Sequence, residues 1–325
     1  MKKDLYLLKF EPILKEKVWG GNKLEKLFNK RSVSSKTGES WEISDLEDNT
    51  SVVTNGPLAG KSIQELLEEF KEDLVGEKVF KTFGIKFPLL IKYIDAAENL
   101  SIQLHPNDVI AKEKHNSFGK TEMWYIMQAD EGAELILGFK EPISKSKYVE
   151  LVEKNELPDA LNRVKVSVGD AFIIPPGLIH AIGEGVVLAE IQQTSDVTYR
   201  IYDWDREEEN GEKRELHTAL ALEAIDLSSN NGHKISYQAK QNCASEIIST
   251  NYFITNIVEV KDEIIINYSE KDCFIVLMGV EGEATIRMDS GKYEVLKQGE
   301  TLLVPASACK IEIKSKGAKI LEVSV

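Results

Sequence analysis

Three short polar motifs, far apart in the sequence, most constrain what this chain can fold into. The stretch 103–106 reads Gln-Leu-His-Pro, 119–122 reads Gly-Lys-Thr-Glu, and 169–180 runs from a Gly-Asp turn through Pro-Pro-Gly to a histidine. The first and third residues of the first motif lie two positions apart, so on a β-strand their side chains point to the same face. The residues that end the other two motifs can complete a site of four nitrogen and oxygen ligands, which suits zinc or a similar divalent ion. The four candidate ligands are Gln103, His105, Glu122 and His180.

The third motif also has a recurring spacing. Gly169, Pro175 and His180 follow the pattern Gly-x5-Pro-x4-His, which is similar to the second half of the cupin metal signature. In that signature the glycine allows a turn, the proline fixes the bend and the histidine faces into a barrel. With the run 88–92, Pro-Leu-Leu-Ile-Lys, the motifs resemble those of mannose-6-phosphate isomerases, in particular the short bacterial kind of the type I enzymes. The resemblance covers residues 5–220 well and the C-terminal part loosely.

The resemblance implies an enzyme with a metal cofactor. It implies a zinc-dependent aldose–ketose isomerase that interconverts mannose 6-phosphate and fructose 6-phosphate through an enediol or enediolate. It also implies one zinc ion per chain, held by the four ligands named above, and a small phosphosugar as partner.

Further site residues are implied by the same resemblance. Lys120, two residues before the ligand glutamate, is implied to handle the substrate and its protons. The motif 195–200, Ser-Asp-Val-Thr-Tyr-Arg, corresponds to a family motif with an acid–base aspartate and a substrate-facing arginine. The implied catalytic residues are Arg200, Lys120, Asp196 and Glu190, and the implied substrate-binding residues are Ser101, Lys120, Arg200 and Trp19.

Each of these residues has a structural alternative, and the alternatives stay open at this stage. Asp196 could simply pair with Arg200, and Glu190 could orient a ligand imidazole. Lys120 could be a solvated loop residue, and Trp19 could belong to the core. The remaining histidines, His115, His217 and His233, lie in no such motif and are predicted to be surface or core residues.

The chain departs from the family pattern at three positions. Gly119 stands where many relatives have a histidine, Thr121 where they have proline, and Ile182 where a tyrosine is common. These changes concern the routing of protons. The metal ligands themselves are retained.

Periodicity and turn residues predict a mainly β fold. The resemblance implies two cupin (jelly-roll) β-barrel domains, with a small helical region packed beside the first. We expect residues 1–230 to form the metal-binding domain and 240–325 a metal-free, cupin-like barrel, with the Ser/Asn/Gly-rich stretch 228–232 as a linker. Ser62 and Glu65 predict a capping box at the start of one helix. The expected helical segments are about 20–30, 61–75, 145–162 and 214–226.

A weak internal repeat supports the second barrel. The stretch 299–305, Gly-Glu-Thr-Leu-Leu-Val-Pro, repeats the Gly-x5-Pro spacing of the metal motif. Lys310 stands where the metal motif has His180, and a protonated lysine is not a zinc ligand. The repeat therefore predicts a barrel without a metal.

Composition limits the partners and the compartment. The formal net charge of −14 argues against a nucleic-acid partner. No apolar run approaches a membrane span, and the N-terminal residues do not resemble a signal peptide. The three cysteines, Cys243, Cys273 and Cys309, lack paired spacing and predict reduced, mostly buried thiols in a cytoplasmic protein. The oligomeric state is left open.

Two alternatives to the implied function remain. The site could isomerise another phosphosugar or support metal-assisted oxygenation, although the redox-inert character of the ligand set disfavours the latter. The chain could also be a non-catalytic sugar-phosphate-binding cupin. Retention of Lys120, Glu190, Asp196 and Arg200 beside the ligands disfavours a binding-only protein.

Overall fold

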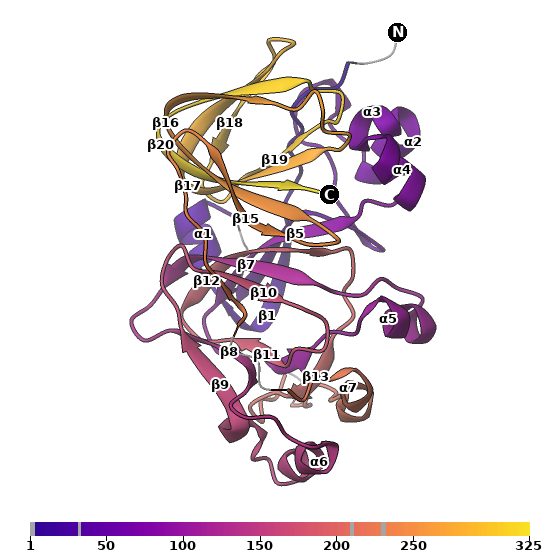
Figure 1. Cartoon of the computed structure of the whole chain (residues 1–325), viewed down its shortest axis with the longest axis vertical. Helices are drawn as coiled ribbons and strands as arrows, with labels where there is room; N and C mark the ends of the chain where they lie inside the picture. Colours follow the sequence, from indigo (N-terminus) through magenta and orange to yellow (C-terminus); the bar gives the residue numbers. More distant parts are fainter. Residues whose placement is uncertain (1–3, 32–33, 209–210, 229–231) are drawn as a thin grey trace.

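The computed structural model describes residues 4–31, 34–208, 211–228 and 232–325, and their strands form three stacked sheets. Figure 1 shows the C-terminal sheet at the top, a central sheet below it and a third sheet beneath that. The expected mainly β fold is confirmed. Among the described residues, however, the hydrogen-bonded strand order runs from edge to edge in each sheet, so these are open sheets and not closed barrels.

The central, seven-stranded sheet carries much of the polar sequence motifs. Its order is β1 (Ile13–Gly21), β2 (Thr37–Ile43), β5 (Leu89–Ala96), β12 (Val186–Gln193), β7 (Glu122–Ala129), β10 (Ala171–Ile174) and β14 (Lys234–Ile235). The five-stranded sheet below it has the order β13 (Tyr199–Tyr202), β6 (Ile102–Leu104), β11 (His180–Ile182), β8 (Glu134–Phe139) and β9 (Leu161–Lys165).

The C-terminal sheet contains the longest strands. Its order is β15 (Ala244–Ser249), β16 (Ile254–Asn267), β20 (Lys310–Ser324), β17 (Ile275–Met288) and β18 (Tyr293–Lys297), and β19 (Thr301–Val304) pairs with β17. A separate small hairpin joins β3 (Asp45–Leu46) and β4 (Asn49–Thr50).

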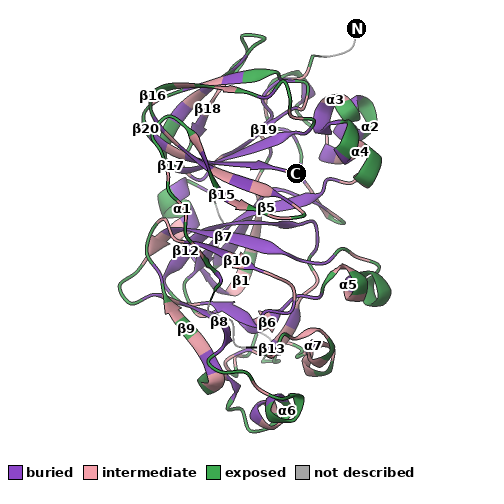
Figure 2. Cartoon of the chain, viewed as in Figure 1, coloured by how far each residue is buried: buried purple, intermediate pink, exposed green. Residues whose placement is uncertain are grey.

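Both faces of the central sheet are buried (Figure 2). Successive side chains of a strand point to opposite faces, and here they enter different cores. Leu89, Ile91 and Tyr93 of β5 belong to the apolar core shared with the C-terminal sheet. Ile94 belongs to the core shared with the five-stranded sheet, as does Trp124 of β7. The intervening polar residues of these strands therefore also face the five-stranded sheet.

Short helices cover the outside of the sheets. They are α1 (Lys23–Phe28), α2 (Ile63–Phe70), α3 (Glu72–Val75), α4 (Glu77–Phe83), α5 (Asp108–His115), α6 (Lys145–Glu153) and α7 (Thr218–Ala224), with 3₁₀ turns at Gly56–Leu58 and Leu157–Ala160. The capping box between Ser62 and Glu65 is present at the start of α2. The sequence did not predict α4 and α5, whose apolar periodicity is weak.

The helical region α2–α4 also contacts the C-terminal sheet. The backbone N–H of Phe274 donates to the carbonyl of Val75, and that of Ala306 donates to Leu74. The Phe274 ring lies 4.6 Å from that of Phe87, centroid to centroid, and both are fully buried. The core on this side is therefore continuous between the two parts of the chain, and the boundaries 1–230 and 240–325 stay a prediction.

The two copies of the internal repeat share the turn but not the burial of the last residue. The turn glycines of the repeat, Gly169 and Gly299, both have positive φ, at 89° and 78°, but Lys310 is exposed where His180 is buried. The middle of the predicted linker, residues 229–231, lies outside the described residues.

Cys273 is buried, whereas Cys243 and Cys309 are exposed, so the prediction of mostly buried thiols was wrong. In the part of the chain that the structure describes, no helix is long and apolar enough to cross a membrane.

Candidate metal centre and active-site cavity

Three side chains from separate motifs meet between the central and the five-stranded sheets. His105 follows β6, Glu122 begins β7 and His180 begins β11, and all three are almost fully buried. Each offers a ligand atom, and these atoms lie within 4.8 Å of one another. Strand pairing brings the two histidines together, because β11 places His180 opposite Gln103 of β6, two residues before His105.

Backbone carbonyls fix the orientation of both imidazoles. Nδ1 of His105 lies 2.9 Å from the carbonyl oxygen of Val197, and Nδ1 of His180 lies 2.9 Å from that of Leu178. A carbonyl only accepts, so each Nδ1 carries the proton and each Nε2 keeps its lone pair. Burial lowers the pKa of His180 and lowers that of His105 to about 4, with the charge of Lys120 adding to both effects. Neutral rings with free Nε2 atoms are the form that binds metals.

The carboxylate of Glu122 stays ionised in this buried place. One oxygen, Oε1, lies 2.8 Å from Nζ of Lys120 and 3.4 Å from Nε2 of His105. Burial by itself would raise the pKa of Glu122, but the charge of Lys120 and the neighbouring imidazoles together outweigh it and hold this pKa well below its usual range. The other oxygen, Oε2, is buried without a hydrogen-bond partner among the described residues.

Gln103 completes the group geometrically. Its amide nitrogen lies 3.5 Å from Nε2 of His180, and its oxygen accepts from the hydroxyl of Ser101 at 3.2 Å. Rotation of the amide by 180° would turn the oxygen toward the histidines. Two free imidazole nitrogens, an unpartnered carboxylate oxygen and an adjacent amide fit a divalent ion such as zinc.

A cavity of about 310 Å³ adjoins this cluster. Its wall combines five basic side chains with three carboxyl groups and several aromatic rings. The lining residues that the argument uses are Lys17, Trp19, Glu39, Trp41, Lys92, Ser101, Gln103, Lys120, Trp124, Glu190, Asp196, Arg200 and Arg214. The cavity thus brings together every implied catalytic and substrate-binding residue, including Trp19, which also belongs to the core beneath it.

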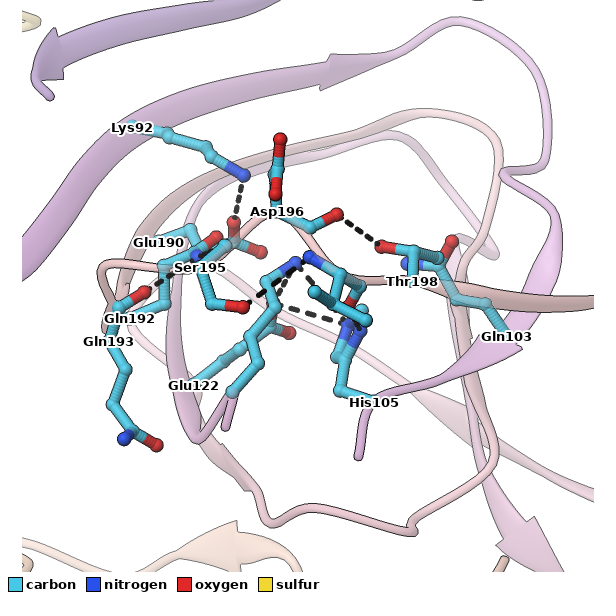
Figure 3. Close-up of polar contacts among 12 residues, drawn as sticks. Lys92, Gln103, His105, Glu122, Glu190, Gln192, Gln193, Ser195, Asp196 and Thr198 are labelled. Carbon is cyan, nitrogen blue, oxygen red and sulfur yellow. Dashed lines mark hydrogen bonds and ion pairs between the residues drawn. The ribbon is translucent and has the colours of Figure 1, made fainter. Parts of the chain in front are cut away.

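Glu190 is held on both oxygens. Nζ of Lys92 lies 2.9 Å from Oε1, and the indole N–H of Trp124 donates to Oε2 at 2.8 Å. Figure 3 shows Lys92 reaching to Glu190 above the His105–Glu122 pair. Burial lowers the pKa of Lys92, but the charges of Glu190, Glu39 and Glu122 outweigh it and raise the pKa overall. Among the described residues, the hydrogen-bond partners of Glu190 are therefore a lysine and a tryptophan, and not the imidazole of a candidate ligand.

Arg200 and Asp196 lie at the cavity without pairing with each other. One nitrogen of Arg200, Nη1, donates to the carbonyl of Glu215 at 2.8 Å, and its Nε is buried without a partner in the described chain. Asp196 is exposed, and no hydrogen bond or ion pair of its carboxylate occurs among the described residues. The alternative of a structural ion pair between Asp196 and Arg200 is therefore wrong, because no such pair occurs among the described residues.

Lys120 is not a solvated loop residue. It is 5% exposed and reaches both Glu122 and His105, whose Nε2 lies 3.4 Å from its Nζ. The histidines outside the motifs take other roles. His115 contacts the Tyr199 hydroxyl, His217 accepts from the backbone N–H of Arg200, and His233 is buried with Nε2 unpartnered among the described residues.

Some cavity residues were not predicted as site residues. Lys17 and Glu39 form an ion pair at 3.4 Å, and the indole of Trp41 donates to Glu39 at 2.6 Å. Arg214 forms two hydrogen bonds with Asp203. The i, i+2 spacing of Lys17 with Trp19 and of Glu39 with Trp41 was the available signal. Arg214 lies in a charged stretch that carries none.

Comparisons with known proteins give the family of this chain. Residues 7–139 match the family model described as the phosphomannose isomerase type I catalytic domain, and residues 245–323 match the model of the mannose-6-phosphate isomerase cupin domain. The mannose-6-phosphate isomerase ManA of Bacillus subtilis (strain 168) is 36% identical over 300 residues, which cover 91% of this chain and 92% of that protein. A mannose-6-phosphate isomerase of Streptococcus mutans is 33% identical, with 89% of each chain covered.

The fold agrees over the whole length. The crystal structure of the mannose 6-phosphate isomerase from Bacillus subtilis superimposes with a TM-score of 0.89 at 34% identity, covering 99% of this chain and 100% of that one. Fold and site define a cupin protein with a buried His–Glu–His cluster beside a basic cavity. The chain belongs to the type I phosphomannose isomerase family.

The Lys92–Glu190 pair gives a first testable prediction. Replacing Lys92 by methionine should lower the free energy of unfolding by about 3–5 kcal/mol, because the Glu190 carboxylate would stay buried with its countercharge removed. Urea unfolding measures this. Lys92→Met combined with Glu190→Leu should recover much of the loss. Lys147→Met, which removes an exposed ion pair, is the control. A Lys92→Met protein as stable as the wild type would contradict the role of the pair.

Proposed function

We propose that this protein is a zinc-dependent aldose–ketose isomerase that interconverts mannose 6-phosphate and fructose 6-phosphate through an enediolate. The observation that carries the proposal is the position of Lys120 between the His–Glu–His cluster and a cavity lined by basic groups. Membership of the family supports the substrate, and the named relatives are mannose-6-phosphate isomerases.

The reaction needs an open sugar chain, a proton moved between C2 and C1, and stabilisation of negative charge on two oxygens. His105, Glu122 and His180, with Gln103, would hold one zinc ion per chain. Zinc bound there would supply Lewis-acid stabilisation of the developing oxygen charge. Lys120, with three N–H donors beside this charge, would orient the sugar hydroxyls and hold a proton close to them.

Capture of the phosphate requires a local field that opposes the global one. The chain carries a formal charge of −14, yet the cavity wall includes Lys17, Lys92, Arg200 and Arg214. The one described hydrogen bond of the Arg200 guanidinium runs from Nη1 to the carbonyl of Glu215, so other N–H groups of the same side chain can donate to a phosphate. We assign phosphate recognition to Arg200 with Ser101, and the stacking wall to Trp19.

Of the two candidate carboxylates, we favour Asp196 for the proton transfer, because of the contacts that each carboxylate makes. Both oxygens of Glu190 already accept a hydrogen bond, one from Lys92 and one from Trp124, so neither can reach the substrate without giving up that bond. Asp196 has no such donors among the described residues. We therefore propose Asp196 as the acid–base group and Glu190 as the residue that holds Lys92 and Trp124 in the wall.

The alternatives are an isomerase of another phosphosugar and a non-catalytic sugar-phosphate-binding cupin. Both would keep the basic cavity, and turnover of mannose 6-phosphate separates them from the proposal.

We also propose that the protein is cytoplasmic, supported by three free cysteines. Cell fractionation that finds the protein outside the cytoplasm would contradict this.

Removal of the metal provides the central test. Chelation should abolish conversion of mannose 6-phosphate to fructose 6-phosphate in a coupled assay, because the charge on the enediolate oxygens would lose its stabilisation. Zinc added back should restore the rate, and elemental analysis should find one zinc per chain. Full turnover in metal-free protein would contradict the zinc proposal. Zinc without turnover would favour another phosphosugar or a binding protein.

Arg200→Ala tests the phosphate contact. The variant should lower kcat/KM for mannose 6-phosphate by about 10–100-fold, as expected for loss of a hydrogen bond to a charged group, while its zinc content stays that of the wild type. Arg163→Ala, at an exposed arginine away from the cavity, should be neutral. Equal loss of zinc and turnover would assign Arg200 a structural role.

Asp196→Asn tests the acid–base assignment. The variant should lower kcat by about 10²-fold or more with unchanged zinc content and stability, because Asp196 is exposed. Glu190→Gln is the matched comparison. A larger loss of kcat in Glu190→Gln than in Asp196→Asn would transfer the acid–base role to Glu190.

A further inference from the structure

One segment, residues 105–122, leaves the site and returns to it, and we call it the excursion. It carries Lys120 and two of the candidate ligands, His105 and Glu122. After His105 the chain leaves the site through α5 and returns at Gly119, from which it enters β7 at Glu122. Figure 1 shows α5 outside the sheets, on the right of the view. The position of Lys120 therefore depends on how the two ends of this excursion are joined.

Two backbone N–H groups close the base of the excursion. The N–H of Lys120 donates to the carbonyl of Pro106 at 3.2 Å, and the N–H of Gly119 donates to Oδ1 of Asp108 at 2.9 Å. A Cβ atom on Gly119 would lie 2.5 Å from the backbone nitrogen of Asp108. Glycine at this position is thus required for the close approach, which gives a physical reason for the departure from the histidine of many relatives.

Gln193, at the end of β12, extends the same contact toward the ligand strand. Its Nε2 donates to Oδ1 of Asp108 at 3.1 Å, and its Oε1 accepts from the N–H of Thr121 at 2.9 Å. Figure 3 shows the Gln193 side chain directed away from His105 and Glu122. Asp108 therefore holds the residues on both sides of Lys120 without touching the cavity itself.

The other carboxylate oxygen of Asp108 is bound by the C-terminal part of the chain. Tyr252, between β15 and β16, donates its hydroxyl to Oδ2. Burial by itself would raise the pKa of Asp108, but the bonds from Tyr252, Gly119 and Gln193 lower it. The same bond raises the pKa of Tyr252 to about 12. The carboxylate is thus held ionised, and its two oxygens are shared between the two parts of the chain.

We propose that Asp108 is a positioning residue for Lys120 and Glu122, and that Tyr252 gives the C-terminal sheet a direct part in setting their geometry. The inference rests on the proposed function in that Lys120 acts on the substrate. It assigns the C-terminal part a contribution to catalysis through one side chain, although that part lines no wall of the active-site cavity.

The test compares two tyrosines whose hydroxyls each bond to the part of the chain before residue 230. Tyr252 lies in the C-terminal part, and Tyr237 lies in the segment that precedes it. Tyr252→Phe removes the bond to Asp108. Tyr237→Phe removes a hydroxyl that donates to the carbonyl of Gly169 at 2.6 Å, away from the excursion, and is the matched control. Hydrogen exchange by mass spectrometry follows the amides of residues 117–122 in zinc-loaded protein, and steady-state kinetics follows the reaction.

Tyr252→Phe should speed exchange of these amides several-fold and lower kcat by about tenfold, since small misplacements of a catalytic group reduce the rate strongly. KM should change less than kcat, because the phosphate contacts proposed for Arg200 and Ser101 lie outside the excursion. Tyr237→Phe should change none of these quantities. Wild-type exchange and kcat in Tyr252→Phe would overturn the role of Tyr252.

Variants of Asp108 test the positioning residue itself. Asp108→Ala should lower kcat by about 10²-fold and zinc affinity by about 10–100-fold, because the excursion also carries His105 and Glu122. Asp108→Asn keeps Oδ1 as an acceptor for Gly119 and should recover most of both. Adding Tyr252→Phe to Asp108→Ala should cause little further change, as expected for coupled residues.

Exchange rates and zinc affinity require no substrate, so they test the inference even if mannose 6-phosphate is not turned over. Asp108→Ala protein with wild-type exchange and zinc affinity would overturn the inference and leave the proposed function intact. Additive effects of Asp108→Ala and Tyr252→Phe on the exchange rate would also overturn it.

Discussion

The buried carboxylate of Glu122 is the group on which the rest of the site depends. An ionised carboxylate loses its hydration on burial, and this cost requires nearby positive charge and hydrogen-bond donors. Lys120 supplies the charge, and the two imidazoles present lone pairs that are fixed by backbone carbonyls. One carboxylate oxygen remains without a protein partner in the described chain. The cluster is therefore arranged for a cation. Around it lie the cavity with its basic side chains and the excursion through α5.

The alternation of the central sheet explains how such a polar cluster coexists with a large apolar core. Along β5, β7 and β12, one set of side chains packs against the C-terminal sheet, and the other set faces the five-stranded sheet. Lys92, Glu122 and Glu190 all belong to the second set, so their charges meet across neighbouring strands. The apolar set supplies the stability that offsets the burial of these charges. Because register is fixed by the apolar set, a slip by one residue would remove all three groups from the site.

Much of the candidate site follows from local patterns. Gln103 and His105 could be paired from their i, i+2 spacing, and His180 from the turn spacing before it. Partners were less accessible. Lys92 was named only within an apolar motif, yet it forms a buried ion pair with Glu190. Tyr252 carries no motif, because its contact with Asp108 joins residues far apart in the sequence. The open sheets, in place of closed barrels, likewise depend on pairings that strand periodicity does not encode.

The sequence by itself determined the mainly β fold, the identity of the candidate ligands and the family, since each depends on residue type and short-range spacing. Only the tertiary structure decided which charges pair, which carboxylate is free and how the C-terminal part reaches Asp108. These outcomes depend on the stacking of sheets and on burial. Both are set by contacts between distant segments, and the strength of an electrostatic interaction changes with its surroundings far more than with residue type.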